Sequence, residues 1–280
     1  MVDLCMMYIE QKQEKTYEEK GFLLLESLLS QKQVAAIVAK LSSTSWKEIP
    51  GTVLEEDGKT LRAIHEVPSK MGVLEKISQH PKLVEPAMQI LGSQVYVHQL
   101  KINFKAAFTE KVWPWHQDFI FWHKEDGMPE PRAVNVAIFL EEVNEFNGPL
   151  CLIPGSHKEG IISSLNQIER DWASIENDEW TLNFQANLKY TTSEKIVSNL
   201  VEKYGIEAPK GVAGSVLFFH PNIVHGSTNN ISPISRKMAI ITYNSLENIP
   251  VSVENPRPDF IVGRNYAAIK PLAYQVLNNI

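Results

Sequence analysis

The chain has 280 residues, of which 44% are hydrophobic and 21% are charged, proportions that are ordinary for a globular protein with a sizeable core. The net charge of -6 at pH 7 argues against a general nucleic-acid binder, whose surface would be basic. No apolar run approaches the roughly 18 residues that a membrane span requires, and residues 1–11 do not read as a secretory signal. Cys5 and Cys151 lie far apart without metal-type spacing, which is typical of a reducing compartment, so we expect a cytoplasmic protein.

The N-terminal part of the chain predicts helices around one short strand. Residues 21–25 form an apolar run that favours a strand. Ser30 followed by Gln33 matches a capping box, and the apolar residues after it keep helical spacing up to Leu41. Further helices are expected over 72–79 and 81–91.

From Ser93 onward the pattern changes to short strands separated by turns rich in Gly, Pro and Asn. The predicted strands cover residues 94–104, 132–140, 148–153, 215–219 and 237–243. A polar, partly helical insertion at 161–210 is predicted to be a lid, with a plain surface excursion as the alternative. Helices followed by many strands, without repeats or a linker, predict one domain over residues 1–280, mainly β with flanking helices, built as a double-sheet jelly roll.

The sharpest signal for chemistry is the segment from Trp115 to Asp118, which reads WHQD. On an extended strand the side chains at i and i+2 point to the same face, so His116 and Asp118 can approach one ion. His225 lies far downstream, near the end of a predicted strand and turn. Two imidazoles and one carboxylate form the facial triad of non-haem Fe(II) oxygenases. A His-x-Asp pair is weak by itself, because most such pairs are incidental surface residues.

Arg236 strengthens this interpretation because it precedes the apolar run 238–243, downstream of His225. An oxygenase of this type needs a fixed cation for the distal carboxylate of 2-oxoglutarate, and the planar fork of arginine binds a carboxylate through two parallel hydrogen bonds. The alternative for Arg236 alone is an exposed charge at a strand end.

Longer segments resemble the phytanoyl-CoA dioxygenase family, and most closely its ectoine hydroxylase branch. The matching segments are 115–119 (WHQDF), 122–129 (WHKEDGMP), 146–150 (FNGPL), 153–158 (IPGSHK), 225–227 (HGS) and 243–248 (YNSLEN). The resemblance runs from about residue 99 to 248. It implies a double-stranded β-helix core of the cupin type, with Fe(II) held by His116, Asp118 and His225. It also implies 2-oxoglutarate and O2 as co-substrates, with Arg236 and Ser227 on the far carboxylate of 2-oxoglutarate.

Residues 99–105 alternate polar and apolar side chains, so one face of the predicted strand is polar. A half-exposed strand is the alternative. The resemblance places Gln99 at a substrate contact and Asn103 and Lys105 at co-substrate contacts. It also makes Trp122 a substrate-facing aromatic residue, for which packing in the core or at the rim is the alternative.

The substrate residues depart from the ectoine branch at Phe121, Met238 and Ile240, where that branch carries a threonine, an asparagine and an aromatic residue. We therefore expect a tailoring dioxygenase that hydroxylates an unactivated C–H bond of a small polar metabolite, either ectoine-like or a guanidino alkaloid of the cylindrospermopsin type. A non-catalytic cupin-like metal or ligand sensor and a hydroxylase of a carrier-tethered amino acid are the alternatives. We expect no nucleic-acid or membrane partner, and either a monomer or a homodimer.

Overall fold

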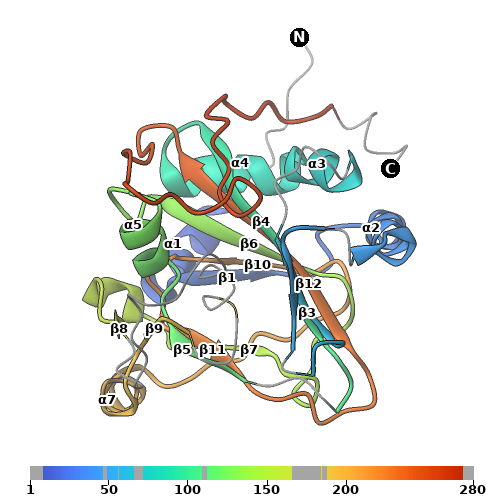
Figure 1. Cartoon of the computed structure of the whole chain (residues 1–280). Helices are drawn as coiled ribbons and strands as arrows, with labels where there is room; N and C mark the ends of the chain where they lie inside the picture. The colour runs from blue at the N-terminus through green and yellow to red at the C-terminus, as the bar shows by residue number, and fades with distance from the viewer. Residues whose placement is uncertain are drawn as a thin grey trace.

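The computed structural model describes residues 9–46, 49–55, 57–65, 72–108, 112–165, 184 and 188–273. In this part of the chain, a seven-stranded antiparallel sheet faces a smaller three-stranded one (Figure 1). The large sheet has the order β1 (Phe22–Leu25), β10 (Val216–Phe219), β6 (Ala133–Phe139), β12 (Arg236–Ser245), β4 (Val95–Lys105), β3 (Leu61–His65) and β2 (Thr52–Leu54). The small sheet has the order β5 (Trp113–His116), β11 (His225–Ser227) and β7 (Leu150–Leu152). The predicted jelly-roll core is confirmed.

Helices cover the outer face of the large sheet. They are α2 (Gln31–Ser43), α3 (Gly72–Ser78) and α4 (Pro81–Leu91), and their apolar side chains join those of β4, β6, β10 and β12 in one core cluster. The predicted capping box of α2 is present, since the Ser30 hydroxyl accepts from the Gln33 backbone N–H and the Gln33 side chain accepts from the Ser30 backbone N–H. Helix α1 (Gln11–Lys20), which precedes β1, was not expected from the sequence.

The inner face of the large sheet and the small sheet enclose a second apolar cluster, which includes Phe22, Ala137, Phe139, Leu217, Phe219, Met238 and Ile240. Strand β6 is therefore buried on both faces, with Val136 against the helices and Ala137 against the interior. Burial on both faces explains why the period-2 alternation of its sequence is weak.

The inner face of the large sheet is organised in rows set by the strand register. One row runs from Ala63 through Asn103 to Met238, and the next from His65 through Lys101 to Ile240. A third row joins Gln99, Thr242 and Asn135. Polar side chains therefore follow β4 along the floor of the space between the two sheets.

The remaining described elements lie at the edges. Helix α5 (Phe119–Glu125) follows β5, and a 3-10 turn (Ser156–Glu159) follows β7. Of the predicted lid at 161–210, the structure describes β8 (Ser164–Leu165), β9 (Tyr190–Thr191) and α7 (Glu194–Tyr204). The rest of that segment up to residue 187, apart from Phe184, lies outside the described residues, so the lid stays a prediction.

Candidate active site

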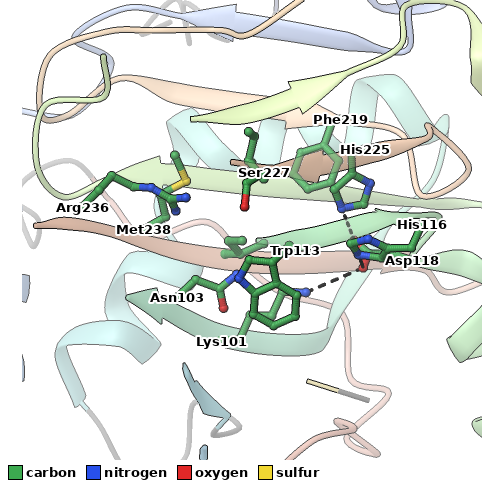
Figure 2. A pocket seen from close by; sticks show the side chains of 12 residues that line it. Lys101, Asn103, Trp113, His116, Asp118, Phe219, His225, Ser227, Arg236 and Met238 are labelled. Carbon is green, nitrogen blue, oxygen red and sulfur yellow. Dashed lines mark ion pairs between the residues drawn. The ribbon is translucent and has the colours of Figure 1, made fainter. Parts of the chain in front are cut away.

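Three buried side chains, His116, Asp118 and His225, converge where the small sheet faces the large one (Figure 2). His116 ends β5, and His225 begins β11 directly opposite it in the strand register. Asp118 Oδ1 lies 3.7 Å from Nε2 of His116, and Asp118 Oδ2 lies 3.8 Å from Nε2 of His225. One ligand atom from each residue lies within 4.8 Å of the others, so this donor set fits a metal ion bound by two imidazoles and one carboxylate.

The local backbone differs from the extended strand that the sequence predicted. The strand ends at His116, and Asp118 has helical dihedral angles (φ -69°, ψ -36°) at the N-cap of α5. The two side chains still meet, because the chain turns between them instead of continuing in a pleat.

Backbone carbonyls orient both imidazoles. Nδ1 of His116 donates to the carbonyl of Pro114 at 2.7 Å, and Nδ1 of His225 donates to that of Ile223 at 3.1 Å. A carbonyl can only accept, so both rings carry a proton on Nδ1 and turn Nε2 toward the centre. Such outer partners hold metal-binding histidines in place.

A chain of hydrogen bonds orients the carboxylate. The Asn135 amide donates to Asp118 Oδ2 at 2.9 Å, and the Thr242 hydroxyl donates to Asn135 Oδ1 at 2.7 Å. Burial raises the pKa of Asp118, but the charge of Lys101 and the neighbouring imidazoles outweigh it and hold that pKa well below its usual value. Burial, together with His116, lowers the pKa of His225 to about 4. The site therefore offers an ionised carboxylate and a neutral His225 imidazole.

A second polar group lies on the same cavity, away from the triad. Arg236, at the start of β12, is buried and donates to the carbonyl of Gly148 at 2.5 Å. The hydroxyl of Ser227 and the amide oxygen of Asn103 are buried nearby, and neither has a hydrogen-bond partner within the described part of the chain. A guanidinium beside an unsatisfied hydroxyl fits the distal carboxylate of 2-oxoglutarate.

The cavity that joins the two groups has an empty volume of about 440 Å³, its open mouth included. Figure 2 shows the triad toward one end and Arg236 toward the other, with Ser227 between them. The walls are largely apolar and are formed by Trp113, Leu150, Phe219, Met238 and Ile240. The floor carries Lys101, whose Nζ lies 3.8 Å from Asp118 Oδ1, and Asn103.

The family model of phytanoyl-CoA dioxygenase (PhyH) matches residues 17–238. The chain belongs to the phytanoyl-CoA dioxygenase family. It is 38% identical to the L-proline trans-4-hydroxylase of Streptomyces griseoviridis over 91% of this chain and 93% of that protein. It is 39% identical to the ectoine dioxygenase of Bordetella bronchiseptica over 93% of this chain and 84% of that protein.

Solved structures agree with this assignment. The crystal structure of EctD from S. alaskensis with 2-oxoglutarate and 5-hydroxyectoine has a TM-score of 0.78 and 29% identity, covering 94% of this chain and 87% of that one. EctD with bound Fe has a TM-score of 0.74. This member of the phytanoyl-CoA dioxygenase family is thus an Fe(II)- and 2-oxoglutarate-dependent dioxygenase that acts on a small molecule. No helix in the described ranges is both long and apolar enough to cross a membrane.

The structure separates the predicted site residues of this family member into two groups. The three predicted metal ligands share one cavity with Arg236, Ser227 and Asn103. Lys105, Gln99 and Trp122 are buried but are not among the residues that line it.

Each of these three has other neighbours. Lys105 packs under Gly148. Gln99 donates to the carbonyl of Ile261 at 3.4 Å. Trp122 lies in the apolar cluster of α5, which also contains Phe119, Ile120, Phe121, Met128, Ala133 and Leu188.

Sequence reasoning missed three residues of this site. Lys101 and Trp113 line the cavity, and Asn135 holds Asp118. The alternation of residues 99–105 carried the signal for Lys101, since it shares a face with Gln99 and Asn103. A single asparagine in the apolar run of β6 was the signal for Asn135.

Proposed function

We propose that the protein hydroxylates an unactivated C–H bond of a small amino or imino acid of the proline or ectoine kind. The observation that carries this proposal is the single small cavity whose lining includes both a two-histidine, one-carboxylate donor set and Arg236 with Ser227. The relatives that the chain resembles over most of its length are named for proline and ectoine. Proline and ectoine are both small zwitterions.

The geometry supports a role for each of these residues. His116, Asp118 and His225 would hold Fe(II), and Arg236, Ser227 and Asn103 would hold the distal carboxylate of 2-oxoglutarate. When bound, the metal and its co-substrates supply the oxidation, in which 2-oxoglutarate is decarboxylated to succinate while the substrate gains one hydroxyl oxygen from O2. The protein orients the substrate C–H bond, and its apolar walls exclude water around it.

The guanidino alkaloid that the sequence suggested has no support from the relatives described above. Lys101 also argues against it, because its ammonium lines the cavity and would face a substrate of like charge. The non-catalytic sensor is disfavoured by family membership together with the complete donor set. A carrier-tethered amino acid stays an alternative that experiment can separate.

The test is succinate formation by iron-loaded protein with 2-oxoglutarate and O2 over a panel that includes L-proline, ectoine and carrier-bound L-proline. We expect one free compound to stimulate succinate and to yield a product one oxygen atom heavier by mass spectrometry. His116→Ala and Arg236→Ala should lose this activity. Turnover of the carrier-bound compound alone would overturn the assignment of free substrates, and succinate formation that survives in His116→Ala would overturn the assigned site.

A further inference from the structure

Two cations, Arg236 and Lys101, line the cavity on the inner face of the large sheet, and Lys101 is the one beside the triad. Arg236 and Ile240 both project from β12 onto this face, and Lys101 is the register partner of Ile240 on β4. Arg236 and Ile240 are four residues apart along β12, a separation of about 13 Å. Arg236 is the group that fits the distal carboxylate of 2-oxoglutarate, whereas Lys101 lies at the triad end of the cavity, with its Nζ 3.8 Å from Asp118 Oδ1.

When metal and 2-oxoglutarate are bound, the positive charge of Lys101 has no negative charge of its own to balance it. Without metal, its ammonium shares the Asp118 carboxylate at 3.8 Å. Among the charged groups that line the cavity, a metal dication bound to Asp118, together with Arg236, balances the two negative charges of 2-oxoglutarate. Two neighbouring arginines outside the cavity lining are matched, because Arg257 pairs with Asp126 and Arg62 pairs with Glu55. Lys101 is largely shielded, with 12% of its side chain exposed, and a cation in this position favours an anionic group from the substrate.

His65 adds a second unsatisfied group beside Lys101. The two residues are direct register partners on β3 and β4, so their side chains share a face and their Cβ atoms lie roughly 5 Å apart. His65 is fully buried behind the residues that line the cavity, and neither ring nitrogen has a hydrogen-bond partner among the described residues. Its ring stacks on Phe184, with 3.8 Å between the ring centroids.

An imidazole buried in this way is costly unless a ligand satisfies it. Burial, reinforced by the charges of Lys101 and Arg257, keeps the pKa of His65 well below its usual value. The ring is therefore neutral and has one N–H to donate.

We propose that Lys101 and His65 form the subsite for the carboxylate of the substrate and thereby select small amino or imino acids. This inference rests on the proposed function and names residues that the family resemblance did not assign. Lys101 supplies the charge, and the His65 N–H supplies a directed hydrogen bond. The anchored carboxylate fixes which C–H bond of the substrate faces the metal position.

The test compares binding of L-proline and L-prolinamide, which differ in the carboxylate charge, by calorimetry on protein loaded with Mn(II) and 2-oxoglutarate without O2. Lys101→Met should raise the Kd of L-proline by about tenfold or more, as expected for a lost charge-assisted hydrogen bond, and should leave the Kd of L-prolinamide nearly unchanged. Lys101→Arg should retain the preference for L-proline. His65→Phe keeps the ring on Phe184 but removes both nitrogens, and should weaken L-proline binding by about fivefold.

Metal and co-substrate binding distinguish this role from a structural one. Lys101→Met removes a cation beside Asp118, so the affinity for Mn(II) should stay equal or rise, and the Kd of 2-oxoglutarate should not change. Lys237→Met is the matched control, because Lys237 lies on neighbouring β12 and pairs with Glu141 outside the cavity. Equal loss of 2-oxoglutarate and L-proline binding in Lys101→Met would overturn the inference and assign Lys101 to the co-substrate.

The same proteins separate this inference from the proposed function. If wild type turns over L-proline or ectoine while Lys101→Met keeps the wild-type preference for L-proline over L-prolinamide, the subsite is wrong and the proposed function stands. If wild type binds neither L-proline nor ectoine, both are overturned. Loss of the preference in Lys101→Met, with 2-oxoglutarate binding retained, supports both.

Discussion

His225 is the direct register partner of His116 across β11 and β5, and the centroids of their imidazole rings lie 4.3 Å apart. Residues far apart in the sequence are therefore fixed by the backbone hydrogen bonds of the small sheet. Each ring is further held by a carbonyl two residues before it in the chain. The two nitrogens proposed to bind the metal are thus held in position by the protein itself.

Replacing either histidine should remove the metal site. We expect His116→Ala and His225→Ala to lose stoichiometric Fe(II) binding to a similar degree, because each leaves only two ligands. Metal analysis after anaerobic loading and calorimetry with Mn(II) measure this. His123→Ala is the control, since His123 is bonded to the carbonyl of Met128 and is not part of the ligand cluster. A variant with one histidine removed that keeps full stoichiometry would contradict the assigned ligands.

Asn135 should affect the metal affinity of the site without contacting the metal. Its amide holds Asp118 Oδ2, and removal of such an outer partner lowers metal affinity by about 10- to 100-fold. We expect this loss in Asn135→Ala. Asn244→Ala also removes a buried asparagine from the large sheet, but its amide bonds to Tyr96 and Asn248. Similar metal affinities in the two variants would show that Asn135 acts only through stability.

Gly148 links the turn before β7 to the co-substrate end of the cavity. Its φ is +73°, an added Cβ would lie 2.8 Å from the carbonyl of Thr228, and its own carbonyl accepts from Arg236. Gly148→Ala should destabilise the fold by more than about 1 kcal/mol and raise the Kd of 2-oxoglutarate by about tenfold, because Arg236 loses its orientation. Urea unfolding and calorimetry provide the two measurements.

Gly92→Ala is the matched control for this effect. Gly92 has a φ of +60° at the end of α4, and nothing lies within 4 Å of an added Cβ. It should show the backbone strain alone, at roughly 1 kcal/mol, with 2-oxoglutarate binding as in wild type. If Gly92→Ala weakened 2-oxoglutarate binding as much as Gly148→Ala, general destabilisation would account for the result.

The sequence was sufficient for most strands of the large sheet, though not for β2 and β3, and for the three residues of the triad. Long apolar runs predicted β4, β6, β10 and β12 to within a few residues, because these strands are the core and their composition leaves little choice. The triad was found because its residue types are rare together. The geometry of the triad was not predicted, because the helical turn at Asp118 depends on where α5 packs and not on the local sequence.

The residues proposed to contact the substrate were harder to predict from the sequence. Gln99 and Trp122 came from family resemblance, yet the cavity is lined by Lys101, which shares the β4 face with Gln99. His65 lies on β3, a strand that the sequence did not predict, and only the pairing of β3 with β4 brings it beside Lys101. Long-range register decides such neighbours, and no local pattern encodes it.

His80 should make stability depend on pH. It is the N-cap of α4, where its Nδ1 accepts from the Lys82 backbone N–H at 3.1 Å. Burial, with a smaller contribution from Lys82, lowers its pKa to about 4. The unfolded chain therefore binds more protons than the native one between pH 4 and the usual histidine value near 6.5, so stability falls as the pH drops through that window.

His80→Asn should remove this contribution, because asparagine caps a helix without titrating. Across this pH window, the free energy of unfolding of the wild type should fall by up to about 1.4 kcal/mol per pH unit more than that of the variant. Above pH 7, the pH dependence of the two proteins should differ little. Urea unfolding at a series of pH values measures the difference. If the free energies of unfolding of wild type and His80→Asn fell in parallel with pH, His80 would not be the source of the pH dependence. A protonated Nδ1 cannot accept from the Lys82 N–H, so this result would contradict the assigned cap.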